Sequence, residues 1–282
     1  MTLEQKYQTL QNILKDMGSV AVAYSGGVDS TFLLKVAYDI LKDNAIGILA
    51  VSPSFPSREY QRAVETVGLI GARLEIIQTN EMDNPEYTSN PVNRCYFCKS
   101  ELFERIAEIS ASGRYRNMVD GSNMDDLSDY RPGLKAIREK GVRSPLQEAG
   151  LTKTEIRELS RALGLPTWDK DALACLSSRF PFGEKIELWK LKMVDQAETY
   201  LSTLGFHNIR ARHSGKSVKI EVDPSEVDRL LSPEIRIPLL HFFKEIGYTT
   251  ISVDLEGYQP GKLSKSNKKE KNENAGIIHN SF

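Results

Sequence analysis

A glycine pair flanked by hydroxyl and carboxylate side chains, Ser25-Gly26-Gly27-Val28-Asp29-Ser30, follows a short apolar run and precedes residues with apolar side chains at helical spacing. Glycines between a buried strand and a helix let an anion approach free backbone amides. Asp29 is placed to hold Mg²⁺. The strand–turn–helix context favours this interpretation over an ordinary turn that only caps the helix. The phosphate-binding loop is therefore predicted to use Ser25, Gly26, Gly27, Asp29 and Ser30.

The three cysteines form a second candidate site, because Cys95 and Cys98 make a Cys-x-x-Cys pair and Cys175 stands alone. In a reducing compartment such a pattern indicates metal or redox chemistry before a structural disulfide. Residues Arg94 and Lys99 beside the pair are expected to lower the thiol pKa values. A three-thiolate metal site, a redox pair with a persulfide carrier at Cys175, and inert buried thiols all remain open.

Carboxylates follow a predicted fourth strand, Asn117–Asp120, in the turn that carries Asp125 and Asp126. Open α/β sheets bind ligands at the carboxyl ends of their strands, which favours a role for Asp125 at the nucleotide. Arg131 could pair with phosphate oxygens. A solvated acidic turn is the alternative.

Two arginines lie two residues apart in a predicted strand, so Arg210 and Arg212 project from one face as a fork for phosphate or carboxylate. Glu198 and Glu221 are candidate partners that orient them. The alternative is a basic stripe on an edge strand that resists aggregation.

Strand-like and helix-like segments alternate through the first part of the chain and predict an α/β fold, a doubly wound, mainly parallel sheet. A shorter run of helices and strands then predicts a smaller C-terminal α+β domain. The expected boundaries are 1–182 for the nucleotide domain and 183–260 for a substrate-binding domain. The polar segment 261–282 is expected to be disordered.

The charge balance is neutral, with a formal net charge of -1 over 282 residues and a sequence pI of about 6.5. The overall charge therefore does not favour nucleic acid or an anionic membrane as a partner. The first residues lack a signal-peptide core, and no segment has the length of a membrane span. A cytoplasmic location is expected.

The segment Ser25–Ser30 resembles the signature of the PP-loop superfamily, whose members cleave ATP between the α and β phosphates. Three further segments are similar to the LarE family, and the resemblance runs from about Val20 to Leu255. They are Asp120–Lys135, Ser144–Ala149 and Ser177–Pro181. That family inserts sulfur into a pyridinium dicarboxylate mononucleotide during the synthesis of a nickel-pincer nucleotide.

The resemblance implies an ATP-dependent, AMP-forming sulfurtransferase that releases pyrophosphate and produces a thiocarboxylate. It implies ATP, Mg²⁺ and a [4Fe-4S] cluster held by Cys95, Cys98 and Cys175, with Cys175 and Asp29 as catalytic residues. Ser178 and Arg179 join the arginines and glutamates above as substrate-binding residues. The implied partners are a small anionic nucleotide and sulfide or a sulfur-donor protein, while homo-oligomerisation is left open.

Related functions provide the alternatives. In some LarE-family members a single cysteine ahead of the Ser-Ser-Arg-Phe segment gives up its own sulfur, and Cys175 is the matching residue here. A PP-loop tRNA thiolase would use the same loop, but the neutral charge and the lack of an aromatic-basic surface count against it. An ammonia-using adenylating ligase would not require three cysteines. A nucleotide-sensing binding module is the alternative outside enzymology.

Overall fold

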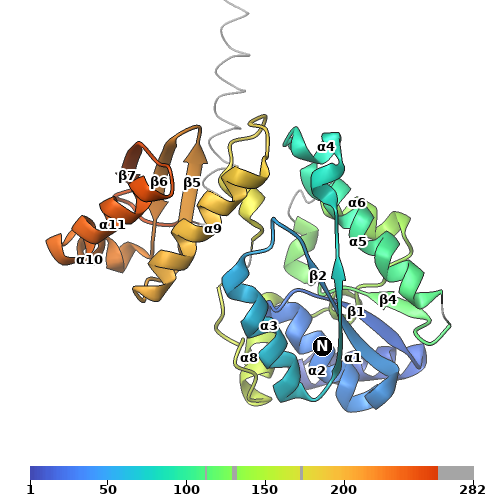
Figure 1. Cartoon of the computed structure of the whole chain (residues 1–282). Helices are drawn as coiled ribbons and strands as arrows, with labels where there is room; N and C mark the ends of the chain where they lie inside the picture. Colours follow the sequence, from blue (N-terminus) through green and yellow to red (C-terminus); the bar gives the residue numbers. More distant parts are fainter. Residues whose placement is uncertain (112, 129–131, 172–173, 260–282) are drawn as a thin grey trace, which may run out of the picture. The chain divides into compact units, whose positions relative to one another are not determined.

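The computed structural model describes residues 1–111, 113–128, 132–171 and 174–259 (Figure 1). The chain divides into two compact units. The first contains Met1–Ser177 and Lys185–Leu191, and the second contains Ser178–Glu184 and the residues from Lys192 onward. The predicted disordered tail, 261–282, lies outside the described residues.

A parallel four-stranded sheet in the order β3-β2-β1-β4 forms the centre of the first unit. Its strands are β1 (Val20–Tyr24), β2 (Ala45–Val51), β3 (Arg73–Gln78) and β4 (Asn117–Val119). In register, Val20 of β1 lies opposite Ala45 of β2 and Asn117 of β4. The central strand β1 thus runs straight into the glycine loop, with β4 ending beside it.

Helices connect these strands. They are α1 (Leu3–Met17), α2 (Val28–Leu41), η1 (Lys42–Asn44), α3 (Ser57–Ile70), η2 (Glu81–Asp83), α4 (Pro85–Thr88), α5 (Arg94–Ser110), η3 (Met124–Ser128), α6 (Pro132–Glu139), α7 (Pro145–Glu148), α8 (Lys153–Ala162) and η4 (Leu176–Arg179). Within the described part of the chain, no helix combines the length and apolar character needed to cross a membrane.

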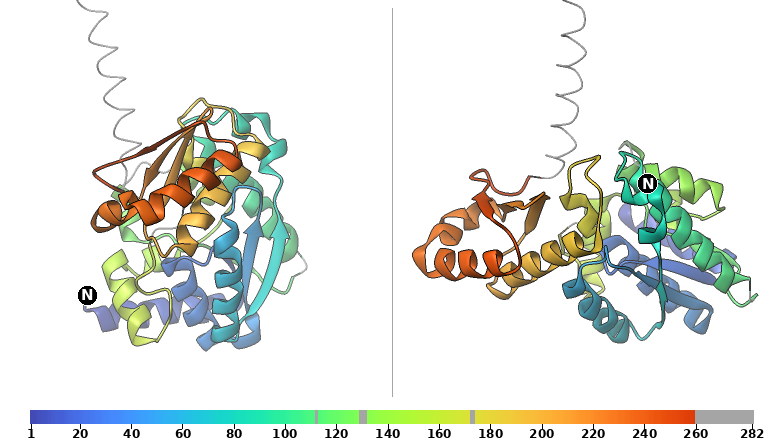
Figure 2. Two further views of the ribbon diagram at one scale, coloured as in Figure 1. Left: turned by 60° about the vertical axis from the view of Figure 1, so that its left-hand side comes forward. Right: turned by 45° about the horizontal axis from the view of Figure 1, so that its top comes forward.

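Both faces of the parallel sheet are covered, which explains the continuous apolar runs of β1 and β2. Val20 and Val22 pack in one buried cluster with side chains of α1, α2, α3 and α8. Ala21 points the other way and packs with Phe103 of α5 and Ile137 of α6. Figure 2 shows the two helix layers from two further directions.

The second unit contains a three-stranded sheet in the order β5-β6-β7. Strand β5 (Arg210–Ser214) is antiparallel to β6 (Ser217–Glu221), and β7 (Thr250–Val253) is parallel to β6. Its helices are α9 (Leu188–Thr203), η5 (Pro224–Glu226), α10 (Val227–Leu231) and α11 (Pro233–Glu245). The predicted fold class, a parallel α/β sheet with a smaller C-terminal α+β unit, is confirmed.

Candidate active site

The glycine loop adopts a conformation that leaves the first amides of α2 available to a ligand. Its N-cap residue is Gly27, so no side-chain oxygen caps the helix. Gly26 has a φ of +73°, and a Cβ there would lie 2.9 Å from the Cβ of Ala63, so any larger residue is excluded. The hydroxyls of Ser25 and Ser30 lie 3.1 Å apart and close the loop.

A cavity of about 230 Å³ opens onto this loop within the first unit. It is lined by Ala23, Ser25, Gly27, Asp29, Ser30, Lys99, Leu102, Phe103, Asp120, Gly121, Ser122 and Asp126. Gly121 packs directly on α2, because a Cβ there would lie 2.9 Å from the Ser30 nitrogen. The cavity therefore joins the loop, the carboxyl end of β4 and one face of α5.

Asp29, the predicted Mg²⁺ ligand, lines this cavity and is held by groups from two other segments. Its Oδ1 accepts from Asn123 Nδ2 at 3.2 Å, and its Oδ2 pairs with Lys153 Nζ at 2.5 Å. Asp120 and Asp126 add carboxylates beside it. Oxygen donors of this kind suit Mg²⁺ bound to nucleotide phosphates.

Asp125 lies outside the lining of the cavity, at the start of α8. Its side chain is exposed, and its carboxylate accepts a hydrogen bond of 2.7 Å from the Lys153 backbone amide. Arg131, the other predicted phosphate contact, is outside the described residues. The nucleotide-binding roles of both residues stay predictions.

The Cys-x-x-Cys pair lies on the first turn of α5, in the same unit as Cys175. Cys95 is exposed, and Cys98 and Cys175 are half-buried. Neighbouring groups of the protein nevertheless shield the Cys95 thiol from part of the surrounding water. Burial raises the pKa of Cys95, and the nearby Cys175 raises it further. Burial is likewise the main reason that the pKa of Cys98 lies well above its ordinary value. Glu81, Cys175 and Cys95 raise this pKa further, in that order of effect.

The expected lowering of the thiol pKa values is therefore wrong for Cys95 and Cys98. Arg94 and Lys99 do lower the pKa of Cys95, as the sequence suggests. Desolvation and the neighbouring thiols outweigh them, since both disfavour a charged sulfur. These mutual effects place the three thiols within electrostatic reach of one another.

Buried polar side chains hold the segment that carries Cys175. The hydroxyl of Tyr87 lies 2.6 Å from Ser177 Oγ, and Arg94 Nη1 donates to the Ser177 carbonyl at 3.0 Å. The Leu176 amide donates to the Ser54 carbonyl at 2.8 Å. Ser54 Oγ in turn donates to the buried carboxylate of Glu81 at 2.7 Å. The cysteine segment is thus tied to α4, α5 and the loop after β2.

In the described residues, no group of three or more His, Cys, Asp or Glu side chains is arranged to hold a metal ion. Cys95, Cys98 and Cys175 supply the sulfur donors that an iron–sulfur cluster uses, but the raised pKa values of Cys95 and Cys98 disfavour the thiolate form, and the cluster stays a prediction. Binding would require the sulfurs to draw together.

The predicted substrate-binding residues all belong to the second unit. Arg179 donates to Glu198 through Nε at 2.7 Å and Nη2 at 2.8 Å, and both side chains are fully buried. Arg212 pairs with Glu221 at 2.9 Å and donates to the Ser178 carbonyl at 3.1 Å. The expectation that Glu198 and Glu221 orient arginines thus has a geometric basis, with Glu198 holding Arg179.

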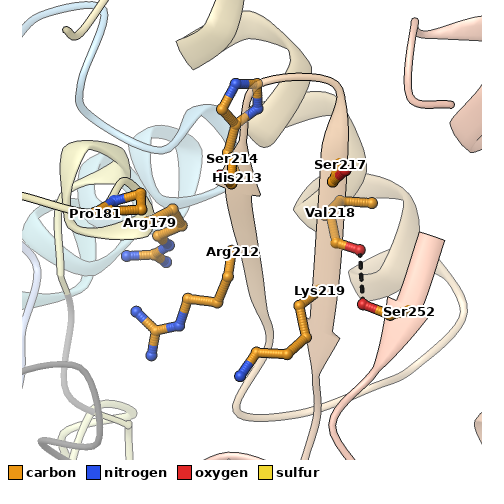
Figure 3. A pocket seen from close by; sticks show the side chains of 9 residues that line it. All are labelled: Arg179, Pro181, Arg212, His213, Ser214, Ser217, Val218, Lys219 and Ser252. Atoms are coloured by element: carbon orange, nitrogen blue, oxygen red, sulfur yellow. Dashed lines mark hydrogen bonds between the residues drawn. The ribbon is translucent and has the colours of Figure 1, made fainter. Parts of the chain in front are cut away.

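A cavity of about 250 Å³ lies over the β5–β6 ribbon of this unit (Figure 3). Arg212 and Lys219 are paired in register on neighbouring strands and extend alongside one another. Arg179 and His213 also line it. Arg210 does not, because it is buried and stacks over Tyr258, 4.5 Å from the ring centre. Burial and the adjacent Arg179 lower the pKa of Arg210.

Sequence reasoning missed several residues around the glycine loop. Lys153, which no sequence pattern linked to the loop, pairs with Asp29. Lys99, expected only as a neighbour of the thiols, lines the nucleotide cavity. Tyr87 and Glu81 carried no recognisable motif. Their contacts join segments that are distant in sequence, so only the fold reveals them.

A parallel sheet whose central strand runs into Ser-Gly-Gly-Val-Asp-Ser at a helix N-terminus defines a PP-loop ATP pyrophosphatase. No protein-family model matches the chain. It is 34% identical over 264 residues to the pyridinium-3,5-bisthiocarboxylic acid mononucleotide synthase of Lactiplantibacillus plantarum, covering 93% of this chain and 95% of that protein. The chain therefore belongs to the LarE family and is an ATP-dependent sulfurtransferase.

The chain is similar to two further proteins. An uncharacterized protein of Synechocystis sp. is 46% identical over 263 residues, covering 93% of this chain and 98% of that protein. A component of the glutamine-hydrolysing GMP synthase of Archaeoglobus fulgidus is 27% identical over 196 residues, covering 64% of this chain and 59% of that protein. The second similarity reflects the shared PP-loop architecture.

Proposed function

We propose that this enzyme activates a carboxylate of a pyridinium-3,5-dicarboxylate mononucleotide with ATP and replaces a carboxylate oxygen by sulfur. The observation that carries the proposal is the presence, in one compact unit, of an uncapped glycine loop beside Asp29 and three mutually interacting thiols. The substrate class comes from the name of the Lactiplantibacillus relative.

In the first step, the glycine loop and Ser30 hold the β and γ phosphates, and Asp29 would hold a Mg²⁺ ion whose charge would offset that of the phosphates. A carboxylate oxygen of the substrate attacks the α phosphorus, and the bond between that phosphorus and the α–β bridging oxygen breaks. Pyrophosphate leaves, and an acyl-adenylate remains. Adenylation is needed because a carboxylate is a poor electrophile at neutral pH.

In the second step, a sulfur nucleophile attacks the acyl carbon. A C–S bond forms, the bond from that carbon to the AMP oxygen breaks, and AMP takes the electron pair. In this proposal the nucleophile is a sulfide held at Cys175, whose segment is fixed by Tyr87, Arg94 and Ser54. The overall exchange consumes one ATP for each sulfur inserted.

Cys95, Cys98 and Cys175 are the residues that would hold a [4Fe-4S] cluster. Three protein thiolates leave one iron open, and that iron could bind the sulfide that is transferred. Arg94 and Lys99 would offset the negative charge of the thiolates. Sulfide itself or a sulfur-donor protein would then supply the sulfur.

The second unit is proposed to bind the phosphate of the mononucleotide. Arg212, oriented by Glu221 and the Ser178 carbonyl, offers a guanidinium group to the cavity of Figure 3, and Lys219 adds an ammonium group. Arg179 lines the same cavity with its charge already paired to Glu198. Arg210, which is buried against Tyr258, does not line this cavity.

ATP–pyrophosphate exchange tests the first step. Exchange should require both Mg²⁺ and the dicarboxylate mononucleotide, and Asp29→Asn should lower its rate on the order of a hundredfold. Asp39→Asn is the matched control, because Asp39 lies on the same helix and pairs with Lys35 away from the cavity. Exchange that is absent with every carboxylate, despite tight ATP binding, would indicate a nucleotide-sensing module.

Iron and acid-labile sulfide analysis of anaerobically prepared protein tests the cluster. About four irons per chain, lost in Cys95→Ala, is the expected result. Metal-free protein in which Cys175 loses the mass of hydrogen sulfide on turnover would instead establish Cys175 as a sacrificial donor.

A further inference from the structure

A lysine from a distant segment contacts the backbone of the glycine loop. Lys170 Nζ donates to the Gly26 carbonyl at 2.9 Å. The same ammonium group lies 2.7 Å from Glu59 Oε2 of α3, as an ion pair outside hydrogen-bond geometry. The Lys170 side chain is 18% exposed and that of Glu59 is 7% exposed, so the contact is largely shielded from water. A charge-assisted hydrogen bond in such a place is stronger than one at the surface.

The segment that carries Lys170 is itself fixed. Arg157 of α8 donates at 2.7 Å to the carbonyl of Trp168 through Nη1, and at 2.7 Å to the carbonyl of Lys170 through Nη2. The Lys170 amide donates to the Thr167 carbonyl at 3.1 Å. Lys170 is therefore held at both its backbone and its side chain. Arg157 fixes the backbone carbonyl, and Glu59 attracts the ammonium group.

Peptide geometry passes this constraint to the loop. The peptide between Gly26 and Gly27 is trans and planar, so its carbonyl and its N–H point in opposite directions. Fixing the Gly26 carbonyl toward Lys170 therefore fixes the Gly27 N–H on the other side, where it donates a long hydrogen bond of 3.4 Å to Ser25 Oγ and both residues line the nucleotide cavity. Two glycines in succession would otherwise let this peptide rotate freely.

We propose that Lys170 is a positioning residue that presets the Gly26–Gly27 peptide for nucleotide binding. The inference rests on the proposed function, because it takes the loop to be the phosphate site. Lys170 acts through the loop and not on the phosphates, since its ammonium group contacts the Gly26 carbonyl and Glu59 and does not line the nucleotide cavity. Glu59 also lies 3.5 Å from Arg58 and 3.7 Å from Arg62.

The test measures binding of Mg²⁺ and α,β-methylene-ATP to the full chain by calorimetry, together with KM and kcat of pyrophosphate exchange. Lys170→Met should weaken binding about tenfold and raise the KM for ATP by the same factor. The KM for the carboxylate substrate should not change. Lys170→Arg, which keeps a cationic donor, should restore most of the affinity.

Lys6→Met is the matched control. The Lys6 side chain is also 18% exposed and also pairs with a glutamate of the first unit, Glu155, but it does not line the nucleotide cavity. It should lower stability to a similar extent and leave the ATP affinity unchanged. If Lys170→Met does not fold, Glu59→Gln provides a milder variant, which should weaken ATP binding about threefold in the same direction.

The salt dependence of binding separates positioning from direct contact. A lysine that neutralises phosphate charge contributes to the decline of affinity with ionic strength, whereas a lysine that orients a peptide does not. The slope should therefore be the same in Lys170→Met and in the unmodified chain. A smaller slope, or an unchanged affinity, would overturn the inference. Failure of the unmodified chain to bind the nucleotide would overturn the proposed function as well.

Discussion

The buried carboxylate of Glu198 holds several neighbouring groups of this enzyme in place. Glu198 is completely buried, accepts two hydrogen bonds from Arg179 and also accepts the Ala211 amide at 2.9 Å. Arg210 lies close enough that Glu198 acts on its pKa. One carboxylate thus balances two guanidinium groups in a place where water does not reach, which makes its loss far more damaging than the loss of a surface partner.

Replacing Glu198 by Gln should lower the free energy of unfolding by about 3–5 kcal/mol, because Arg179 keeps a buried charge without its counter-ion. Urea denaturation of the full chain measures the change. The double variant Arg179→Met with Glu198→Met should be more stable than Glu198→Gln alone, because one buried guanidinium group, that of Arg210, then lacks its counter-ion in place of two. Equal loss in the single and double variants would contradict this account of the pair.

Tyr87 is the second residue whose contact has a measurable consequence. Its hydroxyl lies 2.6 Å from Ser177, two residues after Cys175. Tyr87→Phe removes one hydrogen bond, worth about 1 kcal/mol, so the segment should open more often and Cys175 should react about fivefold faster with an alkylating reagent. Mass mapping of the labelled peptides gives the rate at each cysteine.

The control for this experiment is Tyr24→Phe. Tyr24 is also buried and donates to the Ala63 carbonyl at 3.0 Å, far along the chain from any cysteine. Its loss should leave the alkylation rate of Cys175 unchanged. A rise of equal size in both variants would mean general loosening of the fold and not release of the cysteine segment.

At the scale of helices and strands, local pattern predicted the architecture well. Helix α1 runs from Leu3 to Met17, and the capping box of Thr2 and Gln5 explains why it begins there. The capping box of Thr152 and Glu155 likewise starts α8. Such signals lie within a few residues of one another, so the sequence alone reveals them.

Helix α5 was not predicted, although it presents two of the cysteines. Its first turn, Arg94 to Phe97, holds aromatic and cysteine residues with low helix propensity. The helix is stabilised instead by tertiary packing of Phe103 and Ile106 against the sheet. The same reason explains why the contacts of Lys153, Lys170 and Tyr87 could not be predicted: each joins segments separated by many residues.

The Lys6–Glu155 contact joins α1 to α8 and predicts a pH dependence of stability. Partial burial alone would raise the pKa of Glu155, but hydrogen bonds from Lys6 and Thr152 together lower it below its ordinary value. A lowered pKa in the folded state means that the stabilisation is present above the ordinary carboxyl pKa and is lost as the pH falls through the folded value.

Lys6→Met should therefore cost about 0.5 kcal/mol of unfolding free energy near neutral pH and almost nothing once the pH lies below the lowered pKa of Glu155 in the folded chain. Urea denaturation of both proteins at the two pH values provides the comparison. The same loss at both pH values would show that Lys6 stabilises the chain through packing and not through the charge of Glu155.

At the scale of the whole molecule, the proposed nucleotide site and the proposed substrate site lie in different units of one chain. The nucleotide loop and the cysteines belong to the first unit, and the arginine-lined cavity belongs to the second. Only three residues separate Cys175 from Arg179 in the sequence. The expected boundaries at 182 and 260 stay predictions. The expected partner, a small anionic nucleotide and not a tRNA, stays a prediction.

The most direct test of the central claim is mass spectrometry of a single reaction containing the enzyme, Mg-ATP, the dicarboxylate mononucleotide and sulfide, with AMP and pyrophosphate quantified in parallel. We expect a product in which sulfur replaces a carboxylate oxygen, formed with equal amounts of AMP and pyrophosphate and abolished in Asp29→Asn. Formation of ADP, or incorporation of nitrogen without sulfur, would contradict the assignment of this chain as an AMP-forming sulfurtransferase.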